Sequence, residues 1–155
     1  MKLIIGGAFQ GKKEYASQRY HLKLEDWKDG ETCKKEELYT AAAVCNFHKL
    51  LRRMLQAGEN ISEIPDILRE QNSDIILVTD EVGYGIVPME REEREWREGC
   101  GRVCTVLAAQ SEEVIRVCCG IGKKLKQRQQ ENENLFDTPW RNHGKQRKKI
   151  YWDDG

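Results

Sequence analysis

Short apolar runs alternate with longer stretches of mixed polarity along most of the chain. The apolar runs have the length and continuity of strands that are buried on both faces of a sheet. The stretches between them carry apolar residues at three- and four-residue spacing, which is typical of helices with one buried face. The expected strands are 2–5, 74–79 and 114–119, and the expected helices are 12–20, 36–57, 60–71 and 89–109.

The clearest helical pattern covers 36–57, where Gly58 provides a C-terminal stop. A shorter helix follows, and Asn60 with Glu63 resembles its N-terminal capping pair. Strands that alternate with helices predict an α/β fold, here a three-layer sandwich with a mostly parallel sheet.

Length and charge place this fold in one domain followed by a separate tail. The chain has 155 residues, of which 39% are hydrophobic and 34% charged, so it is polar but not in the disordered class. Lys and Arg number 26, as do Asp and Glu, and this balance gives no reason to expect a nucleic-acid or membrane partner. We expect a nucleotide-binding domain at 1–126 and a basic, aromatic tail at 127–155.

The tail mixes basic and aromatic residues, especially over 139–152. Such a mixture can bind single-stranded nucleic acid through charge and stacking. It also fits a partly disordered segment whose aromatic residues dock on the protein's own surface or on a neighbouring subunit. We favour docking, because no RNA-binding motif accompanies the tail.

A glycine-rich loop follows the first expected strand and fits the pattern G-x-x-x-x-G-K. In such a loop, backbone N–H groups and the following helix N-terminus can hold phosphate oxygens, and Lys12 can reach the terminal phosphates. A tight strand–helix turn explains the same residues without a ligand. The candidate phosphate-binding residues are Gly6, Gly7, Ala8, Phe9, Gln10, Gly11, Lys12 and Lys13.

Two acidic residues, Asp80 and Glu81, end the strand expected at 74–79. An acid at this end of a neighbouring strand can hold Mg²⁺ beside bound phosphates, because ligands of open α/β sheets collect there. Asp80 is therefore the candidate metal ligand and Glu81 a candidate catalytic residue. The alternative is a strand that ends in an ordinary polar turn.

The stretch 78–88, Val-Thr-Asp-Glu-Val-Gly-Tyr-Gly-Ile-Val-Pro, resembles the V-x-N-E-V-G-x-G-I-V-P motif of the adenosylcobinamide kinase/adenosylcobinamide-phosphate guanylyltransferase family. The glycine-rich loop is similar to that family's G-G-x-R-S-G-K-S, and 101–108 and 120–126 also resemble it. The resemblance covers 2–13 and about 74–126.

This resemblance implies a P-loop fold, a trimer and a role in cobalamin biosynthesis. It further implies that ATP or GTP, with Mg²⁺, phosphorylates a cobinamide-type corrinoid, and that a guanylylated histidine then transfers GMP. The chain departs from the family at Lys13, where a Ser or Thr would ligate Mg²⁺, and it lacks the R-I-x-x-H-x-x-x-R-P segment.

His48 has H-x-x-x-R spacing, to Arg52, and is the candidate guanylylated residue. It falls within the helix expected at 36–57 without the flanking Arg-Ile or Pro, so a packed helix-face histidine is the favoured interpretation. We therefore expect phosphoryl transfer to be retained more readily than guanylylation. The alternative is a degenerate P-loop scaffold with an interaction or regulatory role.

The six cysteines are expected to be reduced thiols in a cytoplasmic protein, because the N-terminus lacks a signal-peptide core and no apolar run approaches about 20 residues. Two pairs, Cys100 with Cys104 and Cys118 with Cys119, could suggest zinc. Small buried apolar side chains are the favoured interpretation, since no four-ligand pattern is present.

Overall fold

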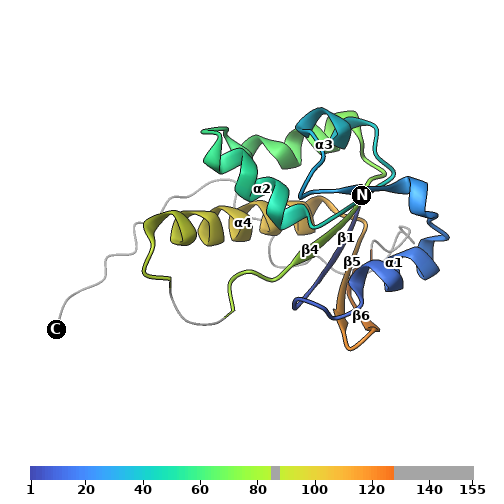
Figure 1. Cartoon of the computed structure of the whole chain (residues 1–155). Helices are drawn as coiled ribbons and strands as arrows, with labels where there is room; N and C mark the ends of the chain where they lie inside the picture. Colours follow the sequence, from blue (N-terminus) through green and yellow to red (C-terminus); the bar gives the residue numbers. More distant parts are fainter. Residues whose placement is uncertain (85–87, 128–155) are drawn as a thin grey trace, which may run out of the picture.

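A six-stranded sheet forms the centre of the protein (Figure 1). The structure is a computed structural model, and it describes residues 1–84 and 88–127. The strands are β1 (Lys2–Gly6), β2 (Trp27–Asp29), β3 (Ala43–Cys45), β4 (Ile76–Asp80), β5 (Glu113–Cys118) and β6 (Ile121–Gln127). The α-helices are α1 (Lys12–Tyr20), α2 (Phe47–Gln56), α3 (Ile64–Gln71) and α4 (Arg91–Gln110). Short 3₁₀ helices are η1 (Leu24–Asp26), η2 (Lys35–Tyr39) and η3 (Ile61–Glu63).

The strands are ordered β2-β3-β4-β1-β5-β6, and all pairs are parallel except β5 with β6. Gly6 at the end of β1 pairs with Asp80 at the end of β4. Parallel pairing brings the carboxyl ends of β1, β3 and β4 to the same edge of the sheet, which is where ligands of such sheets bind. The α/β, P-loop-like fold expected from the sequence is confirmed.

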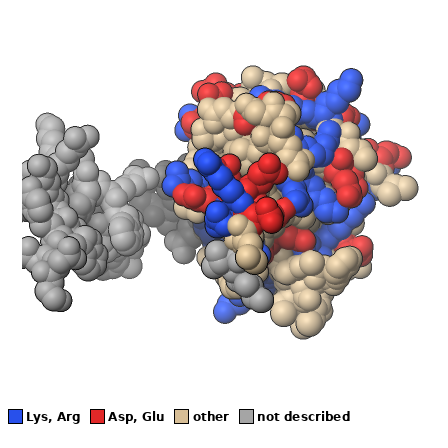
Figure 2. All heavy atoms as spheres, turned by 60° about the vertical axis from the view of Figure 1, so that its left-hand side comes forward, with Lys and Arg blue, Asp and Glu red and all other residues tan. Residues whose placement is uncertain are grey.

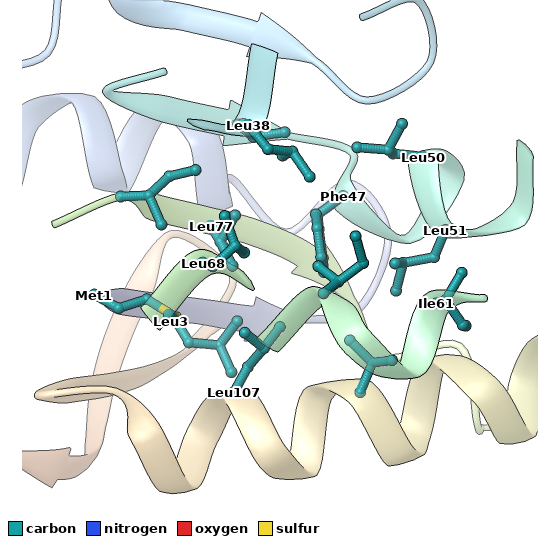
Figure 3. Packing of buried hydrophobic residues seen from close by; sticks show 14 of the residues in the cluster. Met1, Leu3, Leu38, Phe47, Leu50, Leu51, Ile61, Leu68, Leu77 and Leu107 are labelled. Atoms are coloured by element: carbon teal, nitrogen blue, oxygen red, sulfur yellow. The ribbon is translucent and has the colours of Figure 1, made fainter. Parts of the chain in front are cut away.

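Helices cover both faces of the sheet, so the three-layer arrangement is also confirmed. On one face, α2, α3 and α4 pack a core with side chains from the sheet, including Leu3 and Leu77 (Figure 3). Phe47, Leu51 and Leu107 are fully buried in this core. On the other face, α1 contributes Ala16 to a smaller cluster, and Figure 1 shows α1 opposite the other helices.

The prediction of a single helix over 36–57 is wrong for the first half of that range. Residues 35–39 form η2, 43–45 form the buried strand β3, and only α2 from Phe47 onward is α-helical. Asn46 separates the strand from the helix with a positive φ of 52°. The alanine-rich segment has good helix propensity, but its burial between β2 and β4 in the sheet outweighs that local preference.

Two further strands, β2 and β6, lie where no strand was expected. β2 is three residues long, and β6 is exposed along most of its length, so neither carries a strong apolar pattern. The other expected elements are present. β1, β4, β5, α1 and α4 lie within about two residues of their expected bounds, whereas the helix expected at 60–71 is divided into η3 and α3, and α3 begins only at Ile64. The capping role of Asn60 is confirmed at η3, where its side chain accepts the N–H of Ser62.

Charges of both signs are interspersed over the face drawn in Figure 2, without a large patch of one sign. Within the described ranges, no helix is long and apolar enough to cross a bilayer. The predicted tail falls almost wholly in 128–155, outside the described residues, and its expected docking stays a prediction.

Candidate functional site

The glycine-rich loop turns sharply between β1 and α1. Gly6 has a φ of 156°, and a Cβ atom there would lie 2.3 Å from the carbonyl oxygen of Val117. Phe9 and Gly11 have positive φ values of 57° and 77°. Glycine is therefore required by close packing at Gly6 and favoured by backbone conformation at Gly11.

The loop directs its backbone N–H groups away from protein acceptors. Among the residues that the structure describes, the N–H groups of residues 8–13 have no hydrogen-bond acceptor. Residues 12 and 13 are also the first residues of α1, whose N-terminus carries partial positive charge. This arrangement favours an anion in front of the loop.

Lys12 lies beneath the loop and is only 7% exposed. Its Nζ donates to the carbonyl oxygen of Gly7 at 2.6 Å and forms an ion pair with Oδ1 of Asp80 at 2.7 Å. Asp80 is 25% exposed, so the ion pair is shielded at Lys12 and reaches solvent at the carboxylate of Asp80. A bound phosphate and Asp80 would share the same ammonium group.

His48 lies behind Asp80, in the first turn of α2 rather than in mid-helix as expected. Its Nδ1 accepts the backbone N–H of Asp80 at 3.1 Å, and its Nε2 lies 3.7 Å from Oδ2 of the same residue. Burial lowers the pKa of His48, although the charge of Asp80 opposes this effect. An unprotonated Nδ1 fits its role as an acceptor, and the interpretation of His48 as a packed histidine is supported.

The ammonium group of Lys13 lies 5.5 Å from the centre of the Trp27 ring. Asp29, at the end of β2, lies nearby and accepts hydrogen bonds from Nδ2 of Asn46 and the N–H of Glu31. Burial raises the pKa of the Asp29 carboxyl group, but these hydrogen bonds, with the charges of Lys13 and Lys49, outweigh it and hold the pKa below its usual value.

A cavity of about 660 Å³ opens in front of the loop. Of the predicted site residues, it brings together Ala8, Phe9, Gln10, Gly11, Lys12, Lys13 and Asp80. The remaining lining residues are Glu14, Asp29, Cys45, Asn46, Lys49 and Val78, which sequence reasoning missed. If β2 and β3 could be predicted from the sequence, they would identify Asp29, Cys45 and Asn46 as candidates. These residues end or follow the two strands, and ligands of open α/β sheets bind at the carboxyl ends of strands.

Gly6, Gly7, His48 and Glu81 do not line this cavity. Glu81 instead accepts hydrogen bonds from Nε and Nη2 of Arg116, at 3.2 and 3.1 Å, and Arg116 also lies over the ring of Tyr84. The rest of the Gly-Tyr-Gly-Ile-Val-Pro motif falls partly at 85–87, outside the described residues.

A second depression of about 510 Å³ lies between α2 and α4. Its lining includes Glu92, Glu93 and Glu95, with Arg52 and Trp96. It contains none of the predicted residues, and its carboxylates would repel phosphate. The cavity at the loop is therefore the candidate site.

Among the residues that the structure describes, the candidate metal ligand Asp80 does not belong to a cluster of potential metal ligands. Across 1–84 and 88–127, no group of three or more His, Cys, Asp or Glu side chains is arranged to hold a metal ion. Mg²⁺ commonly takes one or two carboxylates and completes its shell with water and substrate phosphates. One carboxylate at the edge of the cavity fits that pattern, whereas the ammonium group of Lys13 cannot replace a hydroxyl ligand.

The cysteines are only partly as expected. All six thiols are free, and Cys33, Cys45 and Cys100 are buried. Cys118 and Cys119 are exposed, so their interpretation as buried apolar side chains is wrong. They lie where β5 leaves the core and turns into β6, which turns both side chains toward solvent.

Sequence comparison finds one matching family and two curated relatives. The sequence profile described as cobinamide kinase / cobinamide phosphate guanyltransferase matches residues 38–125. The bifunctional adenosylcobalamin biosynthesis proteins CobU of Salmonella typhimurium and Escherichia coli are each 52% identical to this chain over 52 residues. That stretch is 34% of this chain and covers 29% of the length of either relative.

Proposed function

Because the chain belongs to the cobinamide kinase / cobinamide phosphate guanyltransferase family, we propose that it binds ATP or GTP at residues 6–13 and acts in cobalamin biosynthesis. The proposed reaction transfers the terminal phosphoryl group to a hydroxyl group of a cobinamide-type corrinoid. The observation that carries this proposal is the set of N–H groups at residues 8–13 without a protein acceptor, in a loop whose Gly7 carbonyl oxygen also accepts the buried ammonium group of Lys12.

Phosphoryl transfer asks the protein mainly to position the reactants and to stabilise charge. The N–H groups of the loop and the N-terminus of α1 would hold the phosphate oxygens. Lys12 would donate to the terminal phosphates, which then compete with Asp80 for its Nζ. The new bond joins the acceptor hydroxyl oxygen to the terminal phosphorus, and the bond to the bridging oxygen of the nucleoside diphosphate breaks.

Asp80 is the residue we propose to hold Mg²⁺, which would neutralise phosphate charge when bound with the nucleotide. Glu81 is proposed as a catalytic residue that would receive the proton of the acceptor hydroxyl. Its ion pair with Arg116 must open for this, since Glu81 does not line the cavity.

Guanylylation has weaker support than phosphoryl transfer. A histidine nucleophile must reach the nucleotide, but His48 is buried, and its Nδ1 is occupied by the N–H of Asp80. His21 lies at the opposite end of the nine-residue α1, about 13 Å from the loop by the rise of an α-helix. We therefore propose that the kinase reaction is retained in preference to GMP transfer.

A degenerate P-loop scaffold with an interaction or regulatory role is the second candidate. The specific observation in its favour is that Asp80 already neutralises Lys12, while Lys13 stands where a hydroxyl ligand is expected. In that case the ion pair would stabilise the fold and leave no ammonium group for phosphate.

The chain is further proposed to work in the cytoplasm as a homo-oligomer, a trimer if it follows the family resemblance, with nucleotide and corrinoid as its partners. Nucleic acid is not among the proposed partners, because Lys and Arg balance Asp and Glu at 26 each, and the face drawn in Figure 2 mixes charges of both signs.

The testing experiment supplies cobinamide and either ATP or GTP labelled in the terminal phosphate, with Mg²⁺. Labelled cobinamide phosphate is expected with the natural chain and not with Lys12→Met. A parallel reaction with GTP labelled in the first phosphate is resolved under denaturing conditions, and no label is expected on the protein. Nucleotide binding without product favours the scaffold, and a stable protein–GMP adduct refutes the preference for the kinase reaction.

A further inference from the structure

The turn between β5 and β6 has an unusual residue at its tip. Cys118 pairs with Ile121, so Cys119 and Gly120 form a two-residue loop, with φ values of 51° and 78°. Tight hairpin turns with two positive φ values favour Asn, Asp or Gly at these positions. Cysteine is not favoured by the backbone conformation of this turn. We therefore ask what the chemistry of its thiol could do there.

Two thiols meet at this turn, and both are accessible. Sγ of Cys118 lies 4.0 Å from Sγ of Cys119, and both residues are exposed. The other cysteines of the described chain are buried or, for Cys104, half-buried. The turn is therefore the place where one reagent can contact two neighbouring thiols at once.

The sulfur separation suits a bridge through one atom better than a direct sulfur–sulfur bond. An atom that forms two sulfur bonds of about 2.3 Å holds the sulfurs about 3.3–3.8 Å apart for bond angles of about 90–110°, a small movement from the 4.0 Å seen here. A disulfide would bring the sulfurs to about 2.05 Å and favours Cα atoms about 4.4–6.8 Å apart. Adjacent Cα atoms lie only about 3.8 Å apart, so a disulfide between neighbours is strained.

The turn also contacts the glycine-rich loop directly. The N–H of Cys119 donates to Oε1 of Gln10 at 2.7 Å, and the N–H of Gly120 donates to the carbonyl oxygen of Gln10 at 2.9 Å. Figure 1 shows the β5–β6 turn beside the loop that leads from β1 into α1. A change in the backbone at Cys119 is thus transmitted to the residue that precedes Gly11 and Lys12.

We propose that Cys118 and Cys119 form a dithiol site that chelates a trivalent arsenical, and that occupation of this site alters the glycine-rich loop. With phenylarsine oxide, two As–S bonds form and the bonds between arsenic and oxygen break. The two thiol protons leave with that oxygen as one molecule of water, so no oxidant or reductant is needed. The dithiol site itself does not depend on whether the loop binds nucleotide.

The test treats the full chain with phenylarsine oxide and follows the intact mass, with Cys118→Ser, Cys119→Ser and, as the matched control, Cys104→Ser. One arsenical per chain is expected for the natural protein and for Cys104→Ser. Either serine at the turn should weaken binding by about a hundredfold or more, because the second bond is no longer intramolecular. Equal binding by Cys118→Ser or Cys119→Ser overturns the site.

Hydrogen exchange in the arsenical-bound protein tests the second half of the proposal. Exchange at residues 8–13 should change on binding in the natural chain and in Cys104→Ser, while a peptide from α3 should stay as it was. Unchanged exchange at 8–13 overturns the coupling to the loop. Both readouts are independent of nucleotide, so a failure here is distinct from a failure of the proposed kinase function.

Discussion

The ion pair between Lys12 and Asp80 joins β4 to the start of α1, and its strength can be measured by a double-mutant cycle. Lys12→Met keeps an unbranched side chain of similar length, and Asp80→Asn keeps the shape of the carboxylate while removing its charge. Each single variant leaves one partner behind in a largely enclosed position, whereas the double variant removes both charges. The cycle therefore isolates the pairwise term.

At 2.7 Å and an effective dielectric constant of about 20, two unit charges attract by roughly 6 kcal/mol. Desolvation of both groups offsets much of this attraction, and Asp80 is partly exposed. We expect a coupling free energy of about 2 kcal/mol, and a loss of about 2–3 kcal/mol in each single variant. The double variant should lose less than the sum of the two single variants.

Urea unfolding at neutral pH gives the free energy of unfolding of all four proteins. The matched control is Lys23 with Glu25, whose Nζ and Oε1 lie 3.8 Å apart with both side chains 77% exposed. That pair should couple by less than about 0.5 kcal/mol. A coupling at Lys12 and Asp80 as small as in the control would refute the pairing as a source of stability.

Three other results follow from the geometry of the site. Burial lowers the pKa of His48, so as the pH falls the unfolded chain binds a proton at this residue before the folded chain does, and the free energy of unfolding should fall below about pH 6.5. His48→Gln should flatten that dependence in urea titrations at several pH values, and an unchanged slope in His48→Gln contradicts the assignment. Gly6→Ala places its Cβ against the carbonyl oxygen of Val117 and should cost about 3 kcal/mol in chemical unfolding, and a cost below about 1 kcal/mol would show that the close approach is absent. Phe9 is 103% exposed, so Phe9→Ala should change the unfolding free energy by less than about 0.5 kcal/mol, and a larger loss in the same assay would mean that the ring packs against the protein.

Sequence reasoning identified the parts of the fold that have strong local signals. β1, β4 and β5 are continuous apolar runs, and α4 has apolar spacing with charged residues around it, so their patterns follow from burial alone. The segment before Phe47 was misassigned because alanines and leucines fit a helix as well as a buried strand. Only its neighbours in the sheet decide between the two, and they are distant in sequence.

The candidate site, like the fold, could be predicted from the sequence only where a local pattern marks it. The glycine-rich loop and Asp80 are local patterns, and the structure brings them to one cavity. Asp29 could not be found, because β2 has only three residues and no apolar alternation. His48 and Asp80, which are in contact, lie 32 residues apart in the sequence, and Gln10 and Cys119 lie 109 residues apart. No local spacing pattern predicts contacts between residues so distant in sequence.

Calorimetric titration of the natural chain and of Lys12→Met with ATP and GTP, each with and without Mg²⁺, tests the central claim most directly. Melting curves without nucleotide first show that the variant is folded. We expect one nucleotide per chain, with affinity falling about 10- to 100-fold in Lys12→Met, because a charge-assisted hydrogen bond contributes about 1.5–3 kcal/mol. Equal affinity in the two proteins, or no binding by the natural chain, would contradict a phosphate site at this loop.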